Sequence, residues 1–153
     1  INQNIEFSEP CAFLTGLCFY TGRYGFNRSN QKAYYWFLKA ASTNINRHAT
    51  YYYLGNLAST HAEAREFYER AEEIKYKENN CHDSLSYIRS SHNVAGKSYE
   101  RILYAMVSFE LGHLYEHGLG GYQNYNAARH KFIEAERDGH PHAAGYEMLL
   151  NVY

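Results

Sequence analysis

The chain holds nine histidines, the residues best suited to metal binding and to acid–base chemistry near neutral pH. His113 and His117 are four residues apart, so in a helix their side chains would share one face with Glu116 beside them. A zincin motif would instead place the acid directly after the first histidine, and a competent zinc site takes at least three protein ligands. We therefore interpret these histidines as solvent-facing positions, and we predict neither a metal nor a cofactor.

Other candidate catalytic groups are weaker. Cys81 and His82 adjoin, but neighbours in sequence usually diverge in space, so a Cys–His nucleophile pair is not expected. The glycine-rich run 118–121 follows a predicted helix, whereas a phosphate-binding loop joins a strand to a helix. Alternating charges over residues 63–77 indicate a solvated helix face. From these patterns we expect a protein that is not an enzyme.

Length and composition limit the classes of protein further. With 153 residues the chain is expected to form a single domain, residues 1–153. Its 17 Tyr, 8 Phe and 1 Trp exclude a disordered chain, and Lys+Arg 15 against Asp+Glu 16 argue against nucleic acid as a partner. No apolar stretch approaches the length of a membrane span, so no membrane insertion is expected.

Cysteine usage bears on the compartment. Three cysteines, at positions 11, 18 and 81, form neither a disulfide framework nor a CxxC zinc motif. A reducing compartment fits this pattern, so we favour a soluble, cytoplasmic protein. The chain opens with Ile1 and carries no signal-peptide pattern, and a secreted or periplasmic location is the alternative if an upstream signal was removed.

A repeated pattern is the main structural signal. Gly16, Gly55 and Gly112 each stand in a helical apolar pattern, although glycine inside a helix costs about 1 kcal/mol relative to alanine. A second stripe follows each glycine, at Ala33, Phe37 and Ala40, at Ala64, Tyr68 and Ala71, and at Ala128, Phe132 and Ala135. We predict that each glycine lets an aromatic ring approach closely, so each unit pairs a helix A, which holds the glycine, with a helix B.

Capping signals divide the chain into elements. Residues 60–63 form a capping box, Gly118 to Gly121 can end a helix in a left-handed turn, and Asn124 is a good N-cap. The eight helices that we predict lie at about 9–22, 29–43, 47–59, 61–78, 82–91, 97–117, 124–138 and 141–152. They form repeat units at about 9–46, 47–78 and 99–139, an irregular insertion at about 78–98 and a closing helix at about 141–152.

The third unit resembles a known repeat. Residues 107–121, with Tyr125 to Ala128 and Phe132 to Ala135, are similar to the SEL-one-like repeat, a relative of the tetratricopeptide repeat with a longer glycine-rich loop. The resemblance is close over about 105–143 and good over 11–46, whereas the middle unit lacks the loop. It implies an all-α fold, an α-solenoid of stacked antiparallel helical hairpins.

The resemblance also implies a function. Such solenoids serve as adaptors or scaffolds that bind another protein or peptide, including as subunits of a larger complex. Toxin-neutralising or virulence-associated binding proteins belong to the same class. A cell-wall or β-lactam-type hydrolase is the alternative, as claimed for cysteine-rich relatives, but those carry a cysteine pair in each hairpin that this chain lacks.

The concave surface of a helical-repeat array is lined mainly by helix A, and we expect a partner peptide or helix to bind there. Removing the positions that the repeat requires leaves the candidates Leu14, Leu17, Tyr51, Tyr53, Asn56, Glu110, His113 and His117. Tyr51 and Tyr53 add aromatic area that the repeat does not need, which is typical of binding hot spots. The alternative is that both tyrosines pack against residues 78–98.

Overall fold

The computed structural model describes residues 9–43, 47–80 and 94–146, and these ranges form helices and turns without any strand. Six helices lie in them, and the all-α prediction is therefore confirmed for this part of the chain. They are α1 (Glu9–Thr21), α2 (Asn30–Ala41), α3 (Arg47–Leu57), α4 (His61–Asn80), α6 (Val94–His117) and α7 (Tyr125–Arg137).

Two of the eight predicted helices are not found among these six. The element at 82–91 lies outside the described residues. The closing helix is predicted to begin at Pro141, but residues 141–145 form turns, so that start is wrong; residue 146 is helical, and residues 147–152 lie outside the described residues. Gly145 has φ 101°, a left-handed conformation that an α-helix cannot contain.

Two helices extend into the insertion predicted at about 78–98. Helix α4 continues to Asn80 and α6 begins at Val94, so both ends of the supposed insertion are helical. The repeat pattern marks the part of each helix that packs against its partner, and these two helices continue beyond that part.

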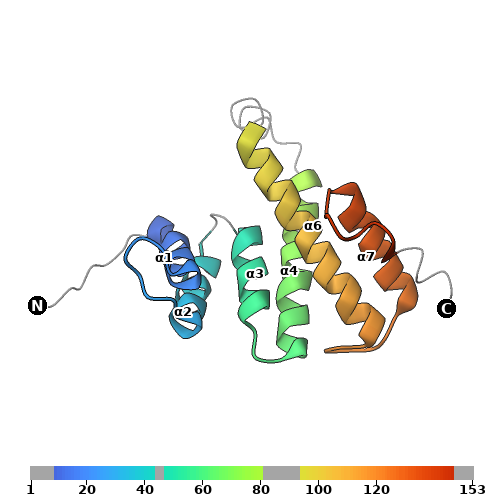
Figure 1. Ribbon diagram of the computed structural model, residues 1–153, viewed down its shortest axis with the longest axis horizontal. Coiled ribbons are helices and arrows are strands. Elements are labelled where there is room, and N and C mark those ends of the chain that lie inside the picture. Colours follow the sequence, from blue (N-terminus) through green and yellow to red (C-terminus); the bar gives the residue numbers. More distant parts are fainter. Residues whose placement is uncertain (1–8, 44–46, 81–93, 147–153) are drawn as a thin grey trace, which may run out of the picture.

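The helices pack in consecutive pairs (Figure 1). Helices α1 and α2, α3 and α4, and α6 and α7 each form a helical hairpin, and α2 packs on α3 as α4 packs on α6. Each hairpin therefore contacts the next one along the chain, and the hairpins lie side by side along the longest axis.

A close contact between a glycine and an aromatic ring holds each hairpin together. The pairs are Gly16 with Phe37, Gly55 with Tyr68, and Gly112 with Phe132. A Cβ atom at Gly16 would lie 2.8 Å from Cδ1 of Phe37, and one at Gly112 would lie 2.7 Å from Cε1 of Phe132, closer than real Cβ contacts occur. The predicted reason for the three glycines is therefore confirmed.

The loops of the first and third hairpins follow the same plan. Gly22 and Gly118, with φ 68° and 63°, end α1 and α6 in left-handed turns. In the first loop the backbone N–H of Ser29 donates to the carbonyl of Phe19, and in the third that of Asn124 donates to Tyr115, both at 2.9 Å. Asn124 also caps α7, because its side chain accepts from the N–H of Ala127, as predicted.

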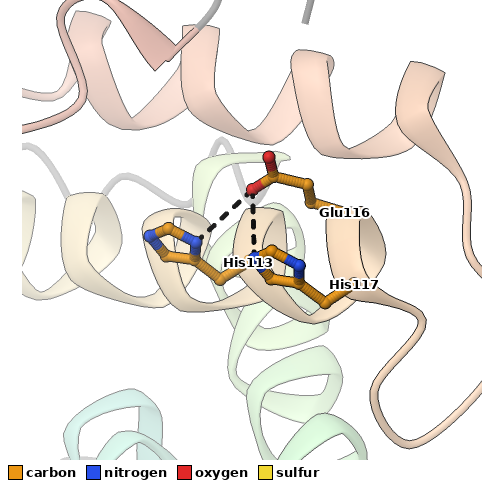
Figure 2. A group of neighbouring side chains, drawn as sticks. All are labelled: His113, Glu116 and His117. Atoms are coloured by element: carbon orange, nitrogen blue, oxygen red, sulfur yellow. Dashed lines mark ion pairs between the residues drawn. The ribbon is translucent and has the colours of Figure 1, made fainter. Parts of the chain in front are cut away.

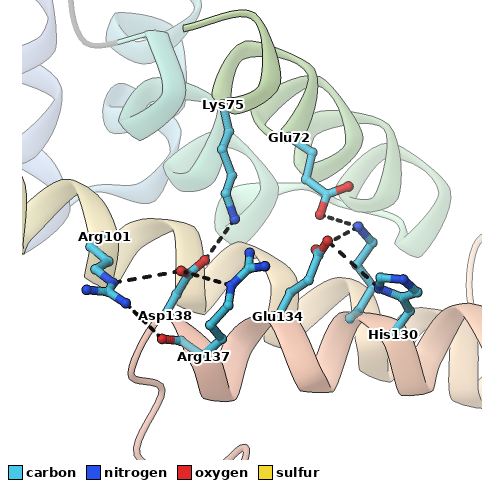
Figure 3. A network of polar contacts seen from close by, with 8 residues as sticks. Glu72, Lys75, Arg101, His130, Glu134, Arg137 and Asp138 are labelled. Atoms are coloured by element: carbon cyan, nitrogen blue, oxygen red, sulfur yellow. Dashed lines mark hydrogen bonds and ion pairs between the residues drawn. The ribbon is translucent and has the colours of Figure 1, made fainter. Parts of the chain in front are cut away.

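Ion pairs join α4 to the third hairpin (Figure 3). Lys75 Nζ donates to Asp138 Oδ2 at 2.8 Å, and Lys131 Nζ donates to Glu72 Oε1 at 2.6 Å and to Glu134 Oε2 at 3.0 Å. These side chains are largely buried, so the prediction that residues 63–77 form a solvated face is wrong for Glu72 and Lys75.

The electrostatics of this junction favour charged pairs. Burial alone would lower the pKa of Lys131, but its hydrogen bonds and charge interactions with Glu72 and Glu134 raise that pKa overall. A buried pair of this kind is costly to break, because removal of one partner leaves the other charge desolvated.

His48 is a buried histidine at the same junction. Its ring meets the ring of Tyr104 of α6 edge-on, with centroids 4.3 Å apart. Burial, together with the positive charge of Lys75, lowers the pKa of His48 to about 3. The folded protein therefore holds His48 as a neutral imidazole at physiological pH.

We expect Gly112→Ala to lower the free energy of unfolding by about 1–3 kcal/mol, because the added methyl group overlaps the ring of Phe132. Helix propensity alone predicts the opposite sign, a gain of about 1 kcal/mol. Urea unfolding followed by circular dichroism measures the change. Glu73→Ala, an exposed site within α4, is the control and should change the stability by less than about 0.5 kcal/mol. A Gly112→Ala variant as stable as the wild type would contradict the proposed contact.

His48 should make the protein less stable at acidic pH. Below the ordinary histidine pKa of about 6.5, His48 binds a proton in the unfolded chain but stays neutral in the folded protein. The free energy of unfolding therefore falls by about 1.4 kcal/mol for each pH unit until the pH reaches the folded pKa. His48→Leu should match or exceed the wild type in stability at pH 7, and its advantage should grow as the pH falls. Urea unfolding at several pH values between about 7 and 4.5 tests this, with exposed His130→Gln as the control. If the stabilities of the wild type and of His48→Leu fell equally with pH, His48 would not be the neutral buried imidazole described above.

Candidate functional site

A groove lies between the second and third hairpins. Its volume is about 520 Å³. One side is formed by Gly55 and Asn56 at the end of α3, by residues 58–60 of the turn that follows and by the first turns of α4, and α6 forms the other side. The remaining lining residues are His61, Ala64 and Tyr68 on α4, Glu110, His113 and Leu114 on α6, and Leu119.

Hydrogen bonds at the start of α4 fix the first wall. The N–H of Glu63 donates to Thr60 Oγ1 at 3.2 Å, and both the N–H and the hydroxyl of Ser59 donate to Glu63 Oε2 at 3.0 Å. The predicted capping box is thus present, but the carboxylate bonds to Ser59 rather than to the N-cap residue. Tyr34 of α2 donates to Glu63 Oε1 at 2.5 Å.

These bonds stabilise a carboxylate. The hydrogen bond from Tyr34 and those from Ser59 lower the pKa of Glu63. The same bond, with burial, raises the pKa of Tyr34 to about 12. Glu63 is therefore ionised at neutral pH and is a weak base.

Tyr68 adds a polar group to the groove. Its ring packs on Gly55, and its hydroxyl donates to Asn56 Oδ1 at 2.7 Å. Burial, with a smaller contribution from the charge of Glu110, raises the pKa of Tyr68, so the hydroxyl keeps its proton. Because Tyr68 occupies the carbonyl oxygen of the Asn56 side chain, the NH₂ group of Asn56 is the part that can donate to a ligand.

The loop of the third hairpin closes one end of this region. Gly120 has φ 73°, and a Cβ atom there would overlap the backbone of His61 and Ala62. Arg65 Nη1 lies next to Gly121, and Arg65 stacks over the ring of Tyr115 at 4.3 Å. The loop at 118–121 therefore rests directly on the start of α4.

The structure brings only part of the predicted site together. Asn56, Glu110 and His113 line the groove, whereas His117, one turn further along α6, lies outside its lining. On the first hairpin, Leu14 is exposed at 59%, and Leu17 packs against the core.

Tyr51 and Tyr53 are placed differently from the other candidates. Tyr51 is only 9% exposed, and its ring lies 6.2 Å from that of Phe67 on α4. Tyr53 stacks on Phe37 of the first hairpin, with centroids 5.2 Å apart and ring planes at 8°. Both tyrosines contribute to packing within and between hairpins, and neither lines the groove. Their alternative partners at 81–93 lie outside the described residues, as do Cys81 and His82.

The sequence reasoning missed the wall from α4. Thr60, His61 and Ala64 are absent from the predicted binding residues, because that prediction places only helix A positions on the binding surface. One signal was present: the middle unit lacks the glycine-rich loop, which brings the start of α4 close to the end of α3. A shorter turn exposes the first turn of helix B where a longer loop would cover it.

The described residues also contain one group with the composition of a metal site. One ligand atom from each of His113, Glu116 and His117 lies within 4.8 Å of the other two. The group lies on α6, and His113 is common to it and to the groove.

Comparisons with known proteins add no relative. No protein-family model matches this chain, and no curated protein matches it.

Among the described helices, none is both long and apolar enough to cross a membrane.

We expect Tyr53→Ala to lower the free energy of unfolding by about 3–5 kcal/mol, because its ring fills the junction between the first two hairpins. Leu14→Ala on the exposed face of α1 is the control and should change stability by less than about 0.5 kcal/mol. Thermal or urea unfolding measures both. A small effect of Tyr53→Ala would show that this ring is not part of the packing.

Proposed function

We propose that this protein is a non-enzymatic interaction module, an adaptor or scaffold that binds a peptide segment of another protein in the groove between the α3–α4 turn and α6. We propose further that its hairpins are SEL-one-like repeats stacked as a short α-solenoid. The shared glycine–ring contact of three hairpins and the matching loops of the first and third support this second proposal.

The observation that carries the binding proposal is the composition of the groove. Asn56, Glu110 and His113 supply hydrogen-bonding and charged groups, and Leu114 and Leu119 supply apolar surface. A peptide in extended form offers both kinds of partner, backbone amides for the polar groups and side chains for the apolar ones. Because Glu110 is exposed and acidic, we expect the bound segment to carry a lysine or arginine near it.

The chemistry of the groove favours binding over catalysis. Ser59 is a hydroxyl beside a carboxylate, but that carboxylate, Glu63, is held by Tyr34 and has a lowered pKa. A serine nucleophile needs a base that can accept its proton, and Glu63 is poorly suited to do so. We therefore assign this pair to capping of α4.

Selection of peptides from a random display library against the wild-type protein tests the proposal. Selected peptides should be enriched in basic residues, and Glu110→Arg should weaken their binding at least about tenfold, because it places like charges together. Glu136→Arg, the same change at an exposed site on α7, is the matched control and should leave affinity unchanged. Fluorescence anisotropy measures both affinities. Peptides that bind Glu110→Arg as tightly as the wild type would refute the groove as the binding site.

A further inference from the structure

Three potential metal ligands lie on the last turn of α6 (Figure 2). His113 Nδ1 and His117 Nε2 each lie 3.6 Å from the same oxygen, Oε2 of Glu116. The two imidazole rings are parallel within 2°, with centroids 6.2 Å apart. Both rings thus turn a nitrogen toward one carboxylate. The spacing of four residues places the two histidines on one face of α6, and rotation of the Glu116 side chain brings its carboxylate to both rings.

The separations are close to those that a metal ion requires. Zinc binds histidine nitrogen and carboxylate oxygen at about 2.0–2.2 Å, so two ligands of a tetrahedral ion lie about 3.4 Å apart. The observed 3.6 Å differs little from this value, and the third separation is below 4.8 Å. The side chain of His117 is 60% exposed, so its ring has room to turn toward an ion.

Two features of the surroundings favour a cation at this place. His113 is 29% exposed, and its ring lies 4.6 Å from that of Phe109 and 5.2 Å from that of Phe132, which hold its orientation. His117 is the last residue of α6, and the carboxyl end of a helix carries a partial negative charge. The site is therefore partly ordered before an ion arrives, and the helix itself attracts positive charge.

We propose that His113, Glu116 and His117 bind one divalent transition-metal ion of the zinc type. Two imidazoles and one carboxylate suit Zn²⁺, Co²⁺ or Ni²⁺, whereas Mg²⁺ and Ca²⁺ prefer sites made of oxygen ligands. Three protein ligands leave a coordination position for water or for a group of a partner molecule. Since His113 also lines the groove, the ion lies beside the surface proposed for peptide binding, although the metal site does not depend on that proposal.

An ordinary ion pair is the competing explanation, and the chain offers a matched example of one. On α7, His130 Nδ1 lies 3.9 Å from Glu134 Oε1 at a spacing of four residues. Among the described residues this pair has no third ligand of the kind that completes the group on α6. His130→Ala is therefore the control for the loss of a helical histidine beside a glutamate.

Isothermal titration of the chain, free of any affinity tag, with Zn²⁺ tests the proposal. We expect one ion per chain, and a Co²⁺ complex whose visible absorption disappears when Zn²⁺ is added. His117→Ala and Glu116→Gln should each weaken Zn²⁺ binding at least about tenfold, because loss of even a residue that only orients a ligand costs about 10–100-fold. His130→Ala should bind like the wild type, and Mg²⁺ should not compete.

Three outcomes would overturn the proposal. They are absence of Zn²⁺ binding to the wild type, unchanged affinity in both His117→Ala and Glu116→Gln, and an equal loss in His130→Ala. Circular dichroism of each variant establishes that the helices are intact, and the exposed position of His117 makes that variant the safer one. Peptide binding by Glu110→Arg is a separate measurement, so failure of one proposal leaves the other standing.

Discussion

The approach of an aromatic ring to the bare backbone of a glycine is the constraint on which this structure depends. It sets how closely the two helices of each hairpin lie, since a side chain at Gly16, Gly55 or Gly112 would displace the ring. In the second hairpin the ring belongs to Tyr68, whose hydroxyl bonds to Asn56 at the groove. The ring of Tyr68 that packs on Gly55 therefore also forms part of the candidate binding surface. A substitution of Tyr68 would change both the packing of the hairpin and the groove.

The two junctions between hairpins rest on different interactions. Stacked rings dominate the first, where Tyr53 of α3 lies on Phe37 of α2. The second adds buried ion pairs to an apolar core, and there Lys75 and Lys131 bridge α4 and the third hairpin. Because desolvated ion pairs demand defined geometry whereas apolar contacts tolerate small shifts, the second junction is the more exacting of the two. The groove lies at this second junction, beside the elements that it fixes.

The features that could be predicted from the sequence are those in which a residue is unfavourable for its local secondary structure. Glycine within a helix is unfavourable without a reason, so Gly55 and Gly112 pointed to a ring contact and identified the partner helix. Burial at the junctions could not be predicted, because helical periodicity tells which residues share a face and not which neighbour covers that face. The pattern therefore predicts Tyr51 either on a binding surface or packed against residues 78–98, and Lys75 on a solvated face, whereas both side chains are buried in the structure. The approach of Glu116 to both histidines depends on side-chain rotation, about which sequence spacing says nothing.

The contact of Gly120 with the backbone of His61 has a consequence for the order of folding. Contacts within a hairpin join residues about one helix apart, whereas this contact joins two hairpins across a much longer stretch of chain. Long loops close more slowly than short ones, so we expect each hairpin to form early and the loop at 118–121 to settle on α4 late. The groove would then be the last feature to appear during folding and the first to vanish during partial unfolding.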